Sequence, residues 1–178
     1  MKIISGERKG HSLATPAGRE TRPTLSRVRE SLFSIIAGDI PGCTFYDLFA
    51  GGGAIGLEAM SRGASRGIFV ESAREPYRCL VRNIEKLRYK ESTEVHFADA
   101  TRWKIPAADD STIIFADPPY RTEIIDNFLQ QLSSAPLSAK SLIILQLPDF
   151  YKKDIPFLKH LRSETYGGTI LGFYLGQA

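Results

Sequence analysis

Residues 117–120 read Asp-Pro-Pro-Tyr, a combination that could activate a weakly nucleophilic nitrogen. The exocyclic amino group of a nucleobase is such a nitrogen, because its lone pair is delocalised into the ring. The Asp117 carboxylate and the Pro118 carbonyl could accept its two hydrogens and turn the lone pair toward a reaction partner. Pro118 and Pro119 hold the backbone rigid, and Tyr120 offers a flat face for stacking. The segment predicts a base-amino site that works by positioning and desolvation, although a diproline turn ending a strand is the plainer alternative.

A glycine-rich segment, Gly51-x-Gly53-x-x-Gly56, lies between an apolar run over 44–49 and a stretch of good helix formers. Glycines in such a place let the backbone approach a ligand closely, and the helix start offers unpaired N–H groups. Glu71 follows at about the 20-residue distance that a dinucleotide-binding fingerprint requires. The segment therefore predicts a nucleotide-type site, whose ligand must be decided by other residues.

Asp47, just before the glycines, distinguishes between two classes of ligand. A carboxylate at the end of this strand would repel the pyrophosphate of NAD or FAD, whereas it would attract an ammonium or sulfonium group. S-adenosylmethionine carries both cations, so Asp47 favours it over a dinucleotide. A tight turn, in which the glycines serve only the packing of helix on sheet, is a third interpretation.

Two further acids stand at the ends of predicted strands. Glu71 suits the two hydroxyls of a ribose, each of which can donate a hydrogen bond to it. Asp99, followed by Ala100, suits the amino group of adenine. Each acid alone could be a helix N-cap or a solvated side chain. Because parallel strands end at the same edge of a sheet, where such sheets bind ligands, these two acids together with Asp47 and Asp117 predict one site.

Hydrophobic periodicity places these residues in an alternating α/β pattern. The predicted strands cover 44–49, 67–71, 94–99, 111–117 and 141–147, and the predicted helices cover 24–37, 54–62, 73–88 and 122–132. An antiparallel hairpin over 160–166 and 169–175 follows them. We therefore expect a Rossmann-like, mostly parallel seven-stranded sheet with a C-terminal antiparallel hairpin and right-handed crossovers.

The N-terminal portion differs in charge from the rest of the chain. Residues 1–23 are irregular in pattern and predict a basic arm with a short β-hairpin, ahead of an α/β domain over 24–178 that makes the chain one domain overall. Residues 1–30 hold seven basic and three acidic side chains, although the net charge of the whole chain is only +3. A basic extension on a neutral domain suits contact with a phosphate backbone, and a solubilising surface is the alternative.

Composition excludes several other classes of protein. Hydrophobic residues at 43% and charged residues at 24% are ordinary globular values. Cys43 and Cys79 have neither CxxC spacing nor a histidine nearby, so we expect no disulfide framework and no metal site. No apolar run is long enough to span a bilayer, and the N-terminus lacks the pattern of a signal peptide. We therefore expect a cytoplasmic protein that does not bind membranes.

Four segments in this order, DLFAGGGAIG (47–56), FVES (69–72), FADA (97–100) and FADPPY (115–120), resemble class I S-adenosylmethionine-dependent amino-methyltransferases. The run RPTLSRVRESLF (22–33) narrows the resemblance to the bacterial RsmD family. That family methylates the N2 amino group of a guanine in 16S ribosomal RNA. The resemblance covers nearly the whole chain, and it implies the class I methyltransferase fold, this activity and S-adenosylmethionine as the cofactor.

The resemblance also implies roles for individual residues. Cofactor binding is expected of Asp47, Gly51, Gly53, Glu71, Asp99 and Ala100. The target guanine is expected at Asp117, Pro118, Pro119 and Tyr120, and RNA is expected at Lys9, Arg22, Arg27 and Arg29. Gly52 stands where the family commonly has Ser, and Ser26 stands where Asp is usual. The segment Gly18-Arg-Glu-Thr-Arg22 also spaces the arm differently from the family pattern. None of these departures touches the core chemistry, and only the change in the arm affects how RNA would dock.

Three other functions stay open at the level of sequence. An amino-methyltransferase that acts on adenine in DNA or RNA would use the same Asp-Pro-Pro-Tyr chemistry. A nicotinamide-dependent oxidoreductase fits the glycine pattern but lacks a convincing proton donor. A non-catalytic RNA-binding module is at odds with the intact set of acids. For the favoured function we expect a monomer that acts on 16S rRNA within the small ribosomal subunit or an assembly intermediate.

Overall fold

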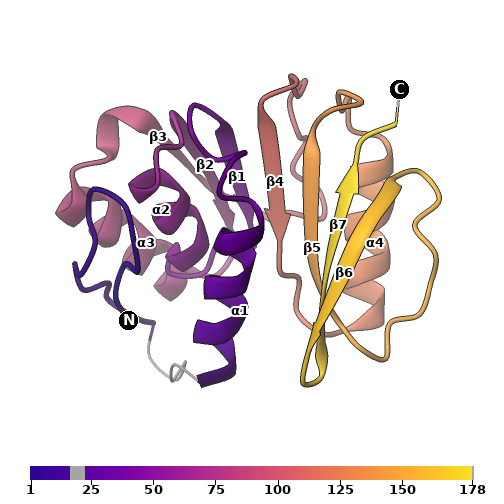
Figure 1. Ribbon diagram of the computed structural model, residues 1–178, viewed down its shortest axis with the longest axis horizontal. Coiled ribbons are helices and arrows are strands. Elements are labelled where there is room, and N and C mark those ends of the chain that lie inside the picture. The colour runs from indigo at the N-terminus through magenta and orange to yellow at the C-terminus, as the bar shows by residue number, and fades with distance from the viewer. Residues whose placement is uncertain (17–22, 178) are drawn as a thin grey trace.

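The computed structural model describes residues 1–16 and 23–177, and within them seven strands form one sheet in the order β3-β2-β1-β4-β5-β7-β6 (Figure 1). The strands are β1 (Thr44–Leu48), β2 (Arg66–Glu71), β3 (Thr93–Phe97), β4 (Thr112–Ala116), β5 (Leu142–Pro148), β6 (Lys159–Tyr166) and β7 (Thr169–Leu175). Strands β1 to β5 pair in parallel, and β7 is antiparallel to both of its neighbours. The predicted sheet and its C-terminal hairpin are confirmed.

The helices follow the predicted alternation with the strands. They are α1 (Pro23–Ile35), α2 (Ala54–Ser61), α3 (Arg74–Leu87) and α4 (Thr122–Ser133), with a short 3₁₀ turn η1 (Lys90–Ser92) after α3. Helices α2, α3 and α4 each connect two parallel strands, whereas the β3–β4 connection over 98–111 is irregular. In the part of the chain that the structure describes, no helix is long and apolar enough to cross a membrane.

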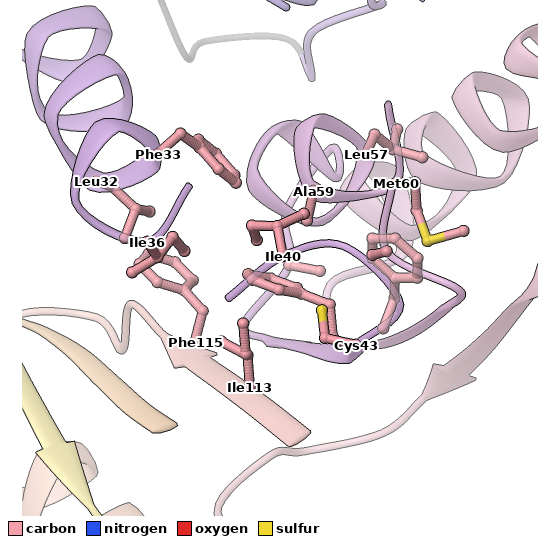
Figure 2. Packing of buried hydrophobic residues seen from close by; sticks show 14 of the residues in the cluster. Leu32, Phe33, Ile36, Ile40, Cys43, Leu57, Ala59, Met60, Ile113 and Phe115 are labelled. Atoms are coloured by element: carbon pink, nitrogen blue, oxygen red, sulfur yellow. The ribbon is translucent and has the colours of Figure 1, made fainter. Parts of the chain in front are cut away.

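Helices cover both faces of the sheet, which explains why its central strands are mostly apolar. All five residues of β4 are buried, as expected for a parallel strand covered on both sides. Helices α1, α2 and α3 pack on one face, where Leu32 of α1 and Ile36, the residue after its end, lie beside Phe115 of β4 (Figure 2). Helix α4 packs on the opposite face, with Phe128 among its buried residues. The central strands are thereby fixed, and the site depends on where they end.

The N-terminal arm lies against α2 and α3 rather than standing apart. The expected hairpin is reduced to a single antiparallel bridge between Lys2 and Ser12. Glu58 of α2, which is fully buried, accepts hydrogen bonds from the backbone N–H groups of Ile4 at 2.7 Å and Ser5 at 2.9 Å. Asn83 of α3 forms hydrogen bonds with the backbone of Ala14, farther along the arm. The arm therefore covers the outer side of the two helices that follow the glycine loop and the second strand.

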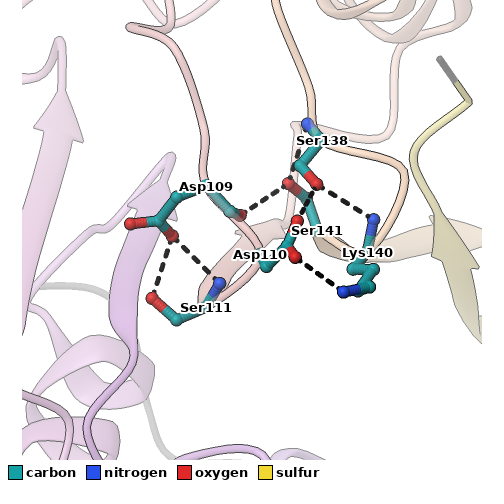
Figure 3. A network of polar contacts seen from close by, with 6 residues as sticks. All are labelled: Asp109, Asp110, Ser111, Ser138, Lys140 and Ser141. Carbon is teal, nitrogen blue, oxygen red and sulfur yellow. Dashed lines mark hydrogen bonds and ion pairs between the residues drawn. The ribbon is translucent and has the colours of Figure 1, made fainter.

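Polar contacts secure the edge of the sheet at which β4 and β5 begin (Figure 3). Asp109 accepts a hydrogen bond from the backbone N–H of Ser111 at 3.0 Å, and its own carbonyl accepts one from the Ser141 hydroxyl at 3.1 Å. Lys140 forms an ion pair with Asp110 at 2.8 Å. This network holds the starts of the two strands, so the opposite edge is left for the predicted site.

Candidate active site

The carboxyl ends of β3, β2, β1 and β4 lie side by side at one edge of the sheet, which we call the carboxyl rim. In Figure 1 it is the lower edge. Glu71 is the last residue of β2, Asp117 directly follows β4, and Asp99 lies two residues after β3. Asp47 of β1 is paired in register with Phe69 of β2 and with Phe115 of β4. The four predicted acids therefore belong to one rim, as the parallel topology requires.

Asp47 stabilises the start of α2 through a hydrogen bond to its backbone. Its side chain is 2% exposed, and its Oδ2 accepts a hydrogen bond from the backbone N–H of Gly56 at 2.8 Å. Burial raises the pKa of Asp47 to about 8, the Gly56 hydrogen bond opposes the rise, and the nearby charges of Asp117 and Glu71 add to it. One of the N–H groups expected to be free for a ligand is thus used within the protein.

Glu71 braces the glycine loop from the neighbouring strand. Its Oε2 accepts a hydrogen bond from the N–H of Gly51 at 2.7 Å, and its Oε1 accepts one from the N–H of Ala73 at 2.7 Å. Gly51 and Gly53 have φ values of 58° and 82°, a left-handed conformation that side chains disfavour. A carboxylate has about four lone-pair sites, so Glu71 retains acceptor capacity for ribose hydroxyls beyond these two bonds.

A groove of about 1140 Å³ opens beside this loop. Asp99 is exposed in the groove, where its Oδ1 accepts hydrogen bonds from both the N–H and the hydroxyl of Thr101, while the adjacent Ala100 is buried. Phe49, Ser72 and Pro119 line the same groove. It runs along α4, so it joins the end of β3 to the Asp-Pro-Pro-Tyr segment and can hold an extended ligand.

Three residues of this region were missed by sequence reasoning. Phe49 lines the groove with a φ of 68° and packs edge-to-face on Phe128, 5.2 Å between ring centroids. Ser72 is the residue directly after Glu71. Asn83 donates hydrogen bonds to the carbonyls of Gly52 at 2.9 Å and of Ala14 at 3.0 Å. For Asn83 the sequence held a signal, because a polar residue stands there among the apolar positions of the predicted helix, and the structure shows that it is buried.

The four residues of the Asp-Pro-Pro-Tyr segment differ in their exposure to solvent. Asp117 is half-buried, Pro118 is buried, and Pro119 and Tyr120 are exposed. The Pro119 carbonyl accepts a hydrogen bond from the backbone N–H of Arg121 at 2.6 Å, which tightens the turn into α4. Tyr120 is 42% exposed and is one of three exposed large aromatic side chains in the described residues, with Phe97 and Phe150. An open aromatic face beside a carboxylate is what stacking of a base requires.

The residues predicted to contact RNA are not all exposed. Lys9 and Arg27 are exposed, and Arg22 lies outside the described residues. Arg29 was expected on or near the polar side of α1, and this expectation is wrong. It is 6% exposed, and its Nη2 donates a hydrogen bond to the carbonyl of Lys2 at 2.8 Å, because the arm folds back over this side of the helix. Arg29 is therefore not part of the exposed basic surface.

Several known proteins are similar to this chain in sequence and fold. A family model described as conserved hypothetical protein 95 matches residues 1–175. The chain is 34% identical over 184 aligned residues to a protein of Bacillus subtilis named putative rRNA methyltransferase YlbH, with 98% of each chain covered. It is 33% identical over 132 residues to ribosomal RNA small subunit methyltransferase D of Escherichia coli, covering 74% of this chain and 66% of that protein.

The solved structures include a close match in shape. A putative methyltransferase, yhhF from Escherichia coli, superposes with a TM-score of 0.87 at 28% sequence identity, covering 100% of this chain and 98% of the other. The superposition extends over the carboxyl rim, the arm and the C-terminal hairpin, since it spans the whole chain.

Proposed function

The chain belongs to the family described as conserved hypothetical protein 95, the RsmD family of methyltransferases, and on that premise we propose that it transfers a methyl group from S-adenosylmethionine to the N2 amino group of a guanine in 16S ribosomal RNA. The observation that carries this proposal is the position of Asp117 and Tyr120. They stand at the carboxyl rim, on either side of Pro118 and Pro119, and Pro119 lines the groove together with Asp99 from the end of β3.

The residues of the rim fit this cofactor. Glu71 keeps acceptor capacity for the ribose hydroxyls, and exposed Asp99 can accept from the adenine amino group. Glu71 borders the glycine loop, where the ammonium and sulfonium groups would be held, and Asp47 would add its negative charge there once the cofactor's cations favour its ionised form. A nearby cation would also offset the burial that raises the pKa of Asp47. The cofactor supplies an electrophilic methyl group; the protein supplies orientation.

The target base is proposed to bind at the Asp-Pro-Pro-Tyr segment. Asp117 and the Pro118 carbonyl accept the two hydrogens of the amino group, so its lone pair points toward the methyl group. Tyr120 stacks on the base and fixes its plane. After transfer the nitrogen must lose a proton, for which the Asp117 carboxylate is a suitable acceptor. The rate enhancement comes mainly from proximity and desolvation at this rim.

RNA must present the guanine outside a helix, because the amino group has to reach the rim. The guanine is therefore unpaired or flipped out. Exposed Lys9 and Arg27 are proposed to contact phosphates, and Arg22 between them in sequence would do the same. A monomer acting on 16S rRNA in the small ribosomal subunit, or in an assembly intermediate, completes the proposal, and such a substrate places the reaction in the cytoplasm.

Transfer of labelled methyl from S-adenosylmethionine tests this function. The substrates are small ribosomal subunits that lack the modification, naked 16S rRNA and DNA, and the product is digested to nucleosides. We expect label in N2-methylguanosine from the subunit or its RNA. Label only in methyladenine would contradict the guanine assignment and retain the Asp117 chemistry. Absence of label from every substrate, with cofactor binding established by calorimetry, would contradict the proposed reaction.

A further inference from the structure

The hydroxyl of Tyr120 is held by residues from the C-terminal part of the sheet. Its oxygen lies 2.7 Å from Oγ1 of Thr169, the first residue of β7. Burial raises the pKa of Tyr120, and Gln146 of β5, which is 5% exposed, lies close enough to the same hydroxyl to oppose this rise. The side chain is nevertheless 42% exposed. Tyr120 is thus tethered at its polar end while much of its ring remains open to a ligand.

Thr169 is fixed in turn by the structure around it. Gly167 and Gly168 connect β6 to β7, and Gly167 has a φ of 58°, which permits the tight turn. The Gly168 carbonyl accepts a hydrogen bond from the backbone N–H of Asp149 at 3.0 Å. Thr169 is paired in register with Pro148, the last residue of β5. These contacts attach the turn to the end of β5. The hydroxyl of Thr169 therefore has little freedom to move.

Helix α1 supports the same turn from the other side. The hydroxyl of Tyr166, the last residue of β6, contacts the hydroxyl of Ser31 in α1, and its ring packs against the apolar cluster beneath that helix. Ser31 lies one helical turn after exposed Arg27, on the same face of α1. A continuous set of contacts thus joins the helix proposed to bind RNA to the ring proposed to stack on the base.

We propose that Thr169 is a positioning residue for methyl transfer, because its hydroxyl holds the Tyr120 ring in the orientation on which the target base stacks. This inference rests on the proposed function. A tyrosine free to change rotamer would lose that freedom when a base stacks on it, an effect of roughly two- to tenfold in an equilibrium constant. With the ring fixed beforehand, the amino group of the base reaches its attack geometry more often.

Thr169→Val removes the hydroxyl and preserves the shape of the side chain. We expect kcat to fall by roughly three- to tenfold, the size of one lost side-chain restraint. The KM for RNA, which phosphate contacts dominate, and the Kd for S-adenosylmethionine should stay within about twofold. Thr169→Ser restores a hydroxyl and should restore kcat. Thr165→Val on β6 is the matched control. Thr165 is exposed and pairs with Ile170, so strand alternation puts its side chain on the opposite face of the hairpin from that of Thr169, and the variant should behave as wild type.

A double-mutant cycle identifies Tyr120 as the partner. Tyr120→Phe keeps the ring and removes its hydroxyl, so it should reproduce the loss of kcat seen in Thr169→Val. The double variant should lose no more than either single variant, because both changes remove the same contact. Losses that multiply in the double variant, an unchanged kcat in Thr169→Val, or a loss that Thr169→Ser does not reverse would each overturn the assignment.

A measurement without turnover separates this inference from the proposed function. In NMR spectra of protein with labelled tyrosine rings, the Tyr120 resonances should change in Thr169→Val and stay unchanged in Thr165→Val. Unchanged Tyr120 resonances in Thr169→Val would overturn the tether itself. If the wild-type protein methylates no RNA, the proposed function fails and the catalytic role of Thr169 fails with it, while the spectra still decide whether Thr169 holds the ring.

Discussion

The Oδ2 atom of Asp47, near the end of β1, accepts a hydrogen bond from the backbone N–H of Gly56 in the first turn of α2 at 2.8 Å. The first N–H groups of a helix have no partner within the helix, so this bond satisfies one of them and fixes the glycine loop between strand and helix. The carboxyl group is also buried beside Glu71 and Asp117, and burial raises its pKa to about 8. Its protonation is therefore linked to folding.

This linkage predicts how stability depends on pH. Folded Asp47 keeps its proton up to about pH 8, whereas the unfolded chain releases it near 3.8. Between these values the folded state binds more protons, so the free energy of unfolding falls as pH rises, by at most about 1.4 kcal/mol per pH unit. Asp47→Asn cannot titrate and keeps an oxygen for Gly56, so its urea denaturation should show a flatter profile between pH 5 and 8. Parallel profiles for the two proteins would contradict the raised pKa.

Glu58 provides a second prediction, about the arm. Its buried carboxylate binds the N–H groups of Ile4 and Ser5 and the Nε of Arg62 at 2.8 Å. Glu58→Ala leaves a largely buried guanidinium and two N–H groups without their acceptor, which should lower the free energy of unfolding by about 3–5 kcal/mol. Urea denaturation measures the loss, and limited proteolysis should show earlier cleavage within residues 1–16.

The control for Glu58 is an exposed carboxylate. Glu75 of α3 pairs with Arg78 at 3.3 Å, and both side chains are largely exposed. Glu75→Ala should change stability by less than about 1 kcal/mol, as is usual for surface ion pairs. Equal losses in the two variants would show that the arm is not held by Glu58.

Arg27 and Arg29 provide a third prediction, because two residues of one helix should have separable effects. Arg27→Ala removes an exposed charge, so RNA binding should weaken and the slope of log K against log salt should decrease by about 0.7–0.9 per lost phosphate contact. Arg29→Ala leaves the Lys2 carbonyl without its donor, and stability should fall by about 1–3 kcal/mol with the salt slope unchanged. Filter binding at several salt concentrations and urea denaturation check both. A reduced salt slope in Arg29→Ala would place that side chain on the RNA.

These cases show which features could be predicted from sequence. The strands and helices were predictable because apolar periodicity is local, and β4 reads as a buried strand from its own residues. The shared rim of acids followed from parallel topology. The burial of Arg29 did not, because it depends on an arm that folds back from more than 20 residues away. The contact between Tyr120 and Thr169 joins residues 49 positions apart and depends on the packing of β7 against β5.

The last prediction concerns Asp117, which the proposed mechanism places on the target amino group. Asp117→Ala removes an acceptor that orients the lone pair, so kcat should fall by at least about 10²–10³, the usual effect of losing one positioned polar group at a reacting centre. The Kd for S-adenosylmethionine, measured by calorimetry, should change by only a few-fold, because Glu71 and the glycine loop remain. Asp149→Ala is the matched control: it removes an exposed carboxylate close enough to influence Tyr120, yet the mechanism gives it no contact with the base. If both variants lose activity equally, general electrostatics of the rim explains the effect. If Asp117→Ala turns over near the wild-type rate, the amino group is activated by some other group and the mechanism is wrong.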